Sequence, residues 1–233
     1  MSAIFKREFK SYFATPLGFI IIAVFTFFSG MFFSVVYSSG SPTVEMVIYV
    51  LSTVALFAVP FITMRLISED RRQKVDQVLL TAPVGVKGIV MGKFFAAFAL
   101  FALSCAATLI YQLIVTFYIT VNWLIYLYAL FGILLYGAVL ISIGMFISSL
   151  TESPVVSAAL TYGVFMAVQL LGGYDSSTGY EWLTKLSEAV SFITRFDGFV
   201  SGQLNVADIV YMLTVSALFV FLSVRSVEKR RWA

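Results

Sequence analysis

Charged residues divide this chain into long uncharged stretches that are mostly apolar. Charged residues are absent from residues 11–44, 46–64, 94–151, 153–174 and 209–224. A helix needs about 20 predominantly apolar residues to cross a bilayer, and each of these stretches holds at least one run of that length. The longest stretch holds two runs, which are divided near Asn122. The pattern therefore predicts six membrane spans, at about residues 17–37, 45–64, 90–118, 124–149, 155–172 and 207–224.

The first 16 residues have a different pattern, which predicts a helix lying on the membrane surface. Their apolar side chains recur at helical spacing: Ile4, Phe5, Phe9, Tyr12 and Phe13. Charged residues occupy the rest of the circumference, as expected of an interfacial amphipathic helix. Pro16 ends this helix before the first span begins. The alternative is that residues 1–16 are only a positively charged flank that sets the topology.

The polar segment at residues 65–88, between the second and third spans, is longer than a simple connection requires. Four apolar residues in it recur at i, i+3, i+4 and i+7: Val75, Val78, Leu79 and Ala82. Glu69 and Asp70 stand near the N-terminal end, where a helix dipole favours negative charge, and Pro83 closes the segment. We expect a short amphipathic helix. Its apolar stripe must be covered by the membrane interface, by the ends of the spans or by a partner protein.

Composition agrees with a single transmembrane domain over residues 1–233. Hydrophobic residues make up 61% of the chain and charged residues 12%, and the mean hydropathy is +0.98. Of the 15 Lys and Arg residues, all but Lys185 and Arg195 fall on one side of the predicted spans, in the termini, in the loops or, for Lys93, at the start of the third span. Cytoplasmic loops retain such residues, so both termini and residues 65–88 are predicted to be cytoplasmic. The net charge of +3 then reflects topology, and no nucleic-acid partner is expected.

The extracytoplasmic segment at residues 173–206 is the longest outside the predicted spans. It contains a second apolar stripe at helical spacing: Trp182, Leu186, Ala189, Val190, Ile193 and Phe196. We expect an amphipathic helix that lies at the outer leaflet or dips into it before span six.

Several kinds of chemistry are excluded. The chain has no His and a single Cys, Cys105, so it lacks a Cys/His metal site, a disulfide framework and a His-based triad. The stretch GVKGIVMGKF resembles a phosphate-binding loop only superficially, because three residues separate Gly88 from Gly92 and Phe94 follows Lys93. No acidic residue lies deep in a predicted span, which argues against an ion-coupled transporter. The chain is expected to bind no cofactor and to have no ATPase activity of its own.

Polar residues step along two of the spans. In the third span they are Ser104, Thr108, Gln112 and Thr116, and in the fifth they are Ser157, Thr161 and Gln169. Such rows either line a substrate path or hydrogen-bond neighbouring helices, and we favour helix packing.

Four stretches together carry a family pattern: KREFKSYFATPLGFI, TMRLISEDRRQKVDQVLLTAPVGVKGIVMGKF, SSLTESPVVSA and RFDGFVSGQLNVADIVY. They resemble the ABC-2-type permeases, the membrane subunits of ATP-binding-cassette (ABC) exporters. The closest likeness is to the short permeases associated with bacterial gliding motility and with nitrous-oxide-reductase maturation. The resemblance implies an all-α, type V exporter-like fold, with an elbow helix at residues 1–16, six spans and an outer-leaflet helix before the sixth.

The resemblance also implies partners and a role for residues 65–88. In this family the helix there is a coupling helix, seated in a groove of a separate ATPase subunit. The residues of this chain at the matching positions are Glu69, Asp70, Arg71, Arg72, Asp76, Leu79 and Leu80. The ATPase subunit would bind ATP and Mg. A second permease, identical or paralogous, would complete a dimer in the bacterial inner membrane that exports an unidentified substrate. The alternative is a complex that transmits force to an extracytoplasmic partner protein without transporting anything.

Overall fold

The structure, a computed structural model, describes residues 2–38, 43–73, 85–118, 120–172 and 191–231, and these are helical apart from short connections. Six helical segments within these ranges are long and apolar enough to cross a membrane, which confirms the predicted spans. They are α2 (Pro16–Ser38), α3 (Val44–Thr63), α6 (Val86–Cys105) continued by α7 (Ala107–Thr116), α8 (Trp123–Leu150), α9 (Pro154–Gly172) and α12 (Val206–Arg231). Three shorter helices accompany them: α1 (Ser2–Ala14), α4 (Ser68–Arg72) and α11 (Phe192–Val200).

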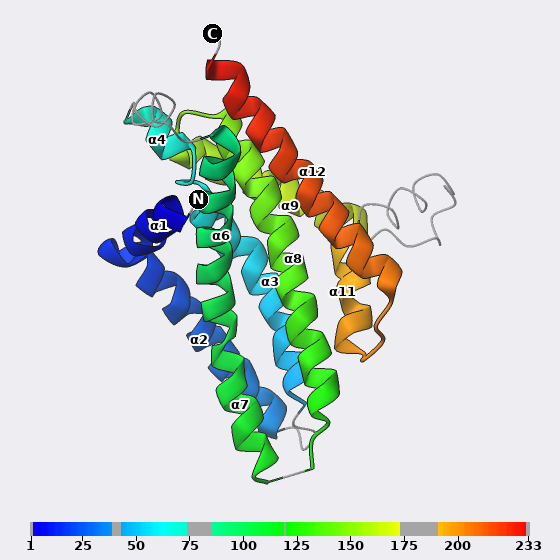
Figure 1. Cartoon of the computed structure of the whole chain (residues 1–233). Coiled ribbons are helices and arrows are strands. Elements are labelled where there is room, and N and C mark those ends of the chain that lie inside the picture. The colour runs from blue at the N-terminus through cyan, green and yellow to red at the C-terminus, as the bar shows by residue number, and fades with distance from the viewer. Residues whose placement is uncertain (1, 39–42, 74–84, 119, 173–190, 232–233) are drawn as a thin grey trace.

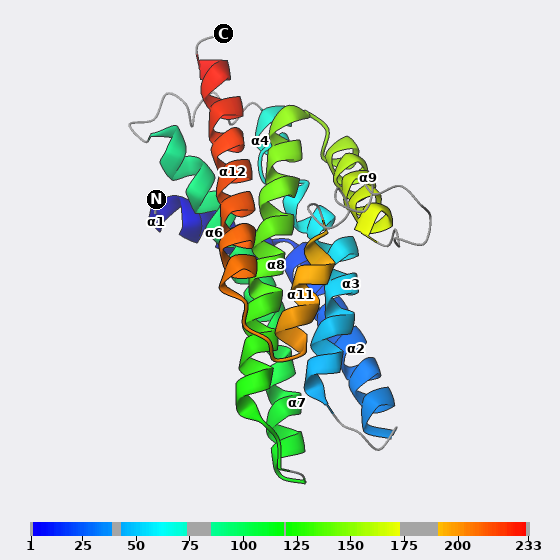
Figure 2. The same cartoon turned by 90° about the vertical axis from the view of Figure 1, so that its right-hand side faces the viewer.

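Helix α8 is the centre of the bundle and packs against α3, α6, α9, α11 and α12 (Figures 1 and 2). Of an 18-residue window in α8, 78% is buried, compared with 17% in α2, α9 and α12. Glycines bring its neighbours close, since a Cβ atom at Gly137 would lie 2.1 Å from the ring of Phe101. The outer helices therefore present most of their surface to lipid or to another subunit.

The two ends of the bundle differ in what they carry. The last turns of α8 and α12 and the short helix α4 lie at one end, which we call the α4 end (Figure 1). The end of α7 and the start of α8 lie at the opposite end. Helix α1 runs across the direction of the long helices and packs against α6 and α2.

The third span was predicted as one continuous helix, and the structure interrupts it at Ala106. The amide of Ala106 donates to the carbonyls of both Ala102 and Leu103, at 3.0 and 3.2 Å. The amide of Leu109 then donates to the Ala106 carbonyl at 3.1 Å, an i to i+3 bond. This single tight turn separates α6 from α7 and leaves the span otherwise intact.

The turn between α1 and α2 depends on two residues. Pro16 is the first residue of α2, a position that tolerates proline because no intrahelical partner exists for that amide. A Cβ atom at Gly18 would lie 2.5 Å from the carbonyl oxygen of Tyr12, so only glycine permits the close approach.

The predicted apolar stripe of α1 faces the bundle. Ile4 and Tyr12 are buried, and the phenylalanines Phe5, Phe9 and Phe13 are partly buried against the core.

Helix α11 covers part of the second predicted amphipathic segment, and residues 173–190 lie outside the described ranges. Its buried side chains are Phe192, Phe196 and Phe199, while Ile193 is only half-buried. The ring of Phe196 stacks on Tyr136 of α8 at a centroid distance of 5.6 Å. Helix α11 is thus part of the packed bundle, held by aromatic contacts to α8 and α3.

Candidate functional site

A group of seven charged residues gathers at the α4 end, where α1, α4, α6 and the connection between α8 and α9 meet. We call it the charge cluster, and its members are Glu8, Arg65, Glu69, Asp70, Arg71, Lys93 and Glu152. Arg65, Glu69, Asp70 and Arg71 belong to the segment between α3 and α6 in which the sequence predicted a coupling helix.

Lys93 of α6 is the most buried member, with a side chain only 3% exposed. Its Nζ atom lies 2.7 Å from Asp70 Oδ2 of α4 and 3.2 Å from Glu8 Oε1 of α1. Burying an ammonium group without partners costs several kcal/mol, and two carboxylates at ion-pair distance offset that cost. Lys93 therefore ties α1 and α4 to the same point on the third span.

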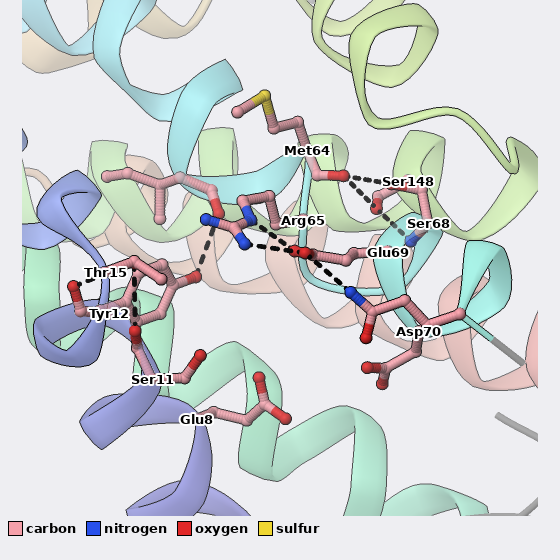
Figure 3. Close-up of polar contacts among 12 residues, drawn as sticks. Glu8, Ser11, Tyr12, Thr15, Met64, Arg65, Ser68, Glu69, Asp70 and Ser148 are labelled. Carbon is pink, nitrogen blue, oxygen red and sulfur yellow. Dashed lines mark hydrogen bonds and ion pairs between the residues drawn. The ribbon is translucent and has the colours of Figure 1, made fainter. Parts of the chain in front are cut away.

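Arg65 and Glu69 form a bidentate pair one helical turn apart (Figure 3). Arg65 Nε donates to Glu69 Oε2, and the second nitrogen donates to Oε1 at 2.7 Å. These hydrogen bonds lower the pKa of the Glu69 carboxyl below its ordinary value, despite partial burial. Because the folded-state pKa is lowered, the stability from this pair is present above the ordinary pKa of Glu and is lost as pH falls through the lowered value.

The chain between α3 and α4 is held by two hydroxyl groups (Figure 3). Ser148 Oγ of α8 accepts from the backbone amides of Ile67 and Ser68, at 3.2 and 3.1 Å. The hydroxyl of Tyr12 in α1 donates to the carbonyl of Ile62 at 3.0 Å. Buried backbone groups of a non-helical turn need such partners, so Ser148 and Tyr12 fix where α3 ends and α4 begins.

Replacing Ser148 with Ala leaves the amides of Ile67 and Ser68 buried without an acceptor. We expect the free energy of unfolding to fall by about 1–2 kcal/mol, the usual range for buried polar groups left unsatisfied. Thermal unfolding of the purified chain in mild detergent measures this loss. Ser34→Ala is the matched control, because Ser34 is exposed on α2, and an equal loss in both variants would contradict the role given to Ser148.

A further ion pair joins α4 to the other side of the bundle. The Arg71 guanidinium lies 2.7 Å from Glu152 Oε1, in the connection between α8 and α9. The Arg71 side chain is 14% exposed and that of Glu152 is 78% exposed, so this pair contributes less than the one at Lys93. It nevertheless adds the start of the fifth span to the elements that α4 contacts.

The predicted contact residues separate into two groups. Glu69, Asp70 and Arg71 are half-buried and bonded within the chain, whereas Arg72 is exposed. Asp76, Leu79 and Leu80 lie outside the described residues, as does the apolar stripe of the predicted coupling helix.

Glu8, Lys93, Ser148 and Glu152 also belong to this site, although the hydrophobic pattern and the family resemblance did not predict them. Lys93 is seven residues inside α6, and its position within an apolar helix was the available signal. From sequence, Lys93 was interpreted only as one of the basic residues that indicate the cytoplasmic side of the membrane.

The two polar rows lie mostly inside the bundle. Ser104, Thr108, Gln112, Ser157 and Thr161 are buried, Gln169 is half-buried and Thr116 is exposed. The Thr108 hydroxyl lies 3.0 Å from the Tyr126 hydroxyl of α8, which links α7 to the central helix. Within the described ranges, acidic, His and Cys side chains form no group of three that could hold a metal ion.

The comparison with known families decides what kind of protein carries this site. A family model described as ABC-2 type transporter matches residues 1–204 of the 233. This chain belongs to the ABC-2 type transporter family. The match covers the elbow helix, the charge cluster and the first five spans. No curated protein matches the chain.

Membership settles the broad role of this ABC-2 chain. It is the permease component of an ABC transporter, a multi-pass membrane protein and not itself an ATPase. The family works with an ABC ATPase and as a dimer. The model matches the family as a whole, so the closer likeness to gliding-motility and nitrous-oxide-reductase-maturation permeases stays a prediction.

Proposed function

We propose that this ABC-2 permease is the membrane subunit of an exporter, and that residues 65–88 receive the motion of a separate ATPase subunit. The observation that carries the proposal is the charge cluster. The short stretch from Arg65 to Arg71 contacts α6, α8 and the α8–α9 connection directly, and Lys93 links it to α1. Partly buried charged networks of this kind resist piecemeal separation, because each broken pair leaves an uncompensated charge. A push on this stretch would therefore move several spans together.

In this proposal the α4 end faces the cytoplasm of a bacterium, and the chain lies in the inner membrane. The distribution of Lys and Arg supports this orientation. Arg72, which is exposed, would contact the ATPase together with Asp76, Leu79 and Leu80. Glu69, Asp70 and Arg71 would instead carry the motion inward, because their side chains are already paired within the chain.

The proposed cycle is alternating access by a pair of permeases, identical or paralogous. ATP and Mg bind to the ATPase subunits, whose closure draws the two α4 ends together and opens the pathway on the far side. Nucleotide affinity must differ between the two permease conformations for this to work, and the coupling is reciprocal. The weakly buried faces of α2, α9 and α12 leave ample surface for the second permease.

Replacing Leu79 and Leu80 with Asp is expected to detach the ATPase subunit. Two carboxylates, one on the apolar stripe and one beside it, would have to be desolvated in the ATPase groove, which opposes binding. The measurement is a pull-down of the tagged permease from native membranes in mild detergent, with mass spectrometry for a soluble subunit that has a Walker A loop. The unchanged chain should retain such a subunit at near-stoichiometric amounts.

A variant with Met at both positions is the matched control, since it keeps the apolar stripe and should retain the ATPase. Retention by the Asp variant would refute the placement of the coupling helix, and absence of any ATPase from the unchanged permease would refute the proposal as a whole. ATP-driven uptake into inverted vesicles then tests export. ATPase activity unaffected by any substrate would instead favour force transmission to an extracytoplasmic partner.

A further inference from the structure

Helices α6, α8 and α12 contact one another (Figures 1 and 2). Side chains from all three line an apolar groove. Its volume is about 690 Å³, and aromatic rings form much of its wall. The phenylalanines that line it are Phe94, Phe95, Phe98, Phe131 and Phe221. A groove open to the bilayer along three spans accepts an extended hydrocarbon chain, because its apolar side chains offer the methylene groups van der Waals contact.

The α4 end of this groove carries positive charge. Lys87, in the first turn of α6, lines the groove, is exposed and has no ion-pair partner among the described residues. Arg225 lies over the ring of Phe221 at 5.3 Å, and Glu228 at 3.4 Å balances its charge. The local balance of these three groups is therefore one positive charge at the mouth of an apolar groove.

The start of α6 adds to this preference for an anion. Gly85 precedes the helix, and no side chain caps it within the described residues. Helix α6 has 20 residues, and the partial positive charge at its N-terminus lies in the same turn as Lys87. The ammonium group and the helix dipole thus favour negative charge at one place.

We propose that this groove is a binding site for an anionic phospholipid, with one acyl chain along the phenylalanines and the phosphate at Lys87. Lipid chains fill any apolar groove that faces a bilayer, so the specific content of the proposal is selection of an anionic headgroup. The inference goes beyond the proposed function and does not depend on an ATPase.

A second large groove provides a contrast within the same chain. It lies between α2 and α3, has a volume of about 830 Å³ and is also apolar. The cation at its end is Arg65, whose charge is already matched by Glu69. The groove at Lys87 differs in that its cation has no ion-pair partner among the residues that the structure describes. We assign no anionic lipid to the groove at Arg65.

Binding of phosphatidylglycerol and phosphatidylcholine to the purified full-length permease tests the proposal. Native mass spectrometry counts the retained lipids, and thermal unfolding measures the stabilisation that they give. We expect preferential retention of phosphatidylglycerol. Lys87→Gln should reduce that preference about fivefold, the effect of losing one basic residue near an anionic headgroup, and leave phosphatidylcholine binding unchanged. Ala217→Phe, which fills the groove, should weaken binding of both lipids.

Two matched variants control for general effects of charge and size. Lys10→Gln removes an exposed lysine of α1, and Leu218→Phe enlarges a neighbouring residue of α12 that does not line the groove. Neither should change lipid binding. An unchanged preference in Lys87→Gln, or unchanged binding in Ala217→Phe, overturns the proposal. Loss of the permease dimer in Ala217→Phe overturns it as well, because the groove would then be a subunit interface. Stabilisation by soluble glycerol phosphate equal to that by phosphatidylglycerol would likewise exclude a lipid site.

Discussion

Replacing Lys93 with Met is expected to lower the free energy of unfolding by about 3–5 kcal/mol, the cost of removing one partner from a buried ion pair. Asp70 would lose its lysine partner and Glu8 would keep only its pair with Arg7, in a place where the two carboxylate side chains are only 19% and 14% exposed. The fluorescence of a thiol-reactive dye measures the loss, because Cys105 is the only cysteine and is buried in the core. The dye then reacts only as the bundle opens.

Two further variants distinguish the buried pair from a general effect of lost charge. Lys10→Met removes an exposed lysine from α1 and should change the unfolding midpoint little. A triple variant with Gln at 8, Asn at 70 and Met at 93 removes all three charges together. It should recover most of the stability, since a buried ionic group replaced as a whole often costs little. If Lys93→Met unfolds like Lys10→Met, the interpretation of Lys93 as the central tie is wrong.

Replacing Gly137 with Val is expected to cost about 3 kcal/mol, the upper part of the range for overpacking a core. A Cβ atom there would lie within 2.1 to 2.7 Å of three ring atoms of Phe101. Phe101 is fully buried and its ring also meets Phe25 edge-on at 5.6 Å, so it has little room to move. The same dye assay measures the change, which reports on contact between α6 and α8.

Two controls test this second prediction: a double variant that removes the clashing ring, and the same substitution at a glycine with open space around it. Phe101→Ala makes room for the added side chain, so the double variant should lose less stability than the sum of the two single losses. Gly163→Val on α9 is the matched glycine substitution, because a Cβ atom there meets nothing within 4 Å. Simple additivity in the double variant, or an equal loss at Gly163, would contradict the packing role of Gly137.

The six spans could be predicted from sequence because crossing a bilayer imposes a length and a composition on each helix independently. The elbow helix was also accessible, since its stripe and Pro16 are local signals. The break at Ala106 was not, because its shared amide bonds leave no mark on the hydrophobic pattern. The packing of α11 onto α8 could not be predicted either, because it depends on which aromatic rings from distant parts of the chain contact one another.

The charge cluster shows why the site was only half predictable. Glu69 and Asp70 were selected because they stand at positions that match the coupling helix of the family, which is local sequence information. The burial of Lys93 depends on Glu8, which comes from the first helix, and on how α1 crosses α6. Nothing near Lys93 in the sequence distinguishes a lysine that forms ion pairs between helices from a basic residue that only sets the membrane orientation. Ser148 is also far in sequence from the start of α4, which its hydroxyl holds.

The order of the three charges at Lys93 has a consequence for how the protein is made. Glu8 and Asp70 both precede Lys93 along the chain, so a ribosome has released both carboxylates before the lysine reaches the insertion machinery. The lysine can be neutralised as soon as the third span emerges, before α8, α9 and α12 enter the membrane. A newly synthesised chain thus need not hold an unpaired ammonium group near lipid. The first half of the protein can be locked in place early, as a template against which the central helix is then inserted.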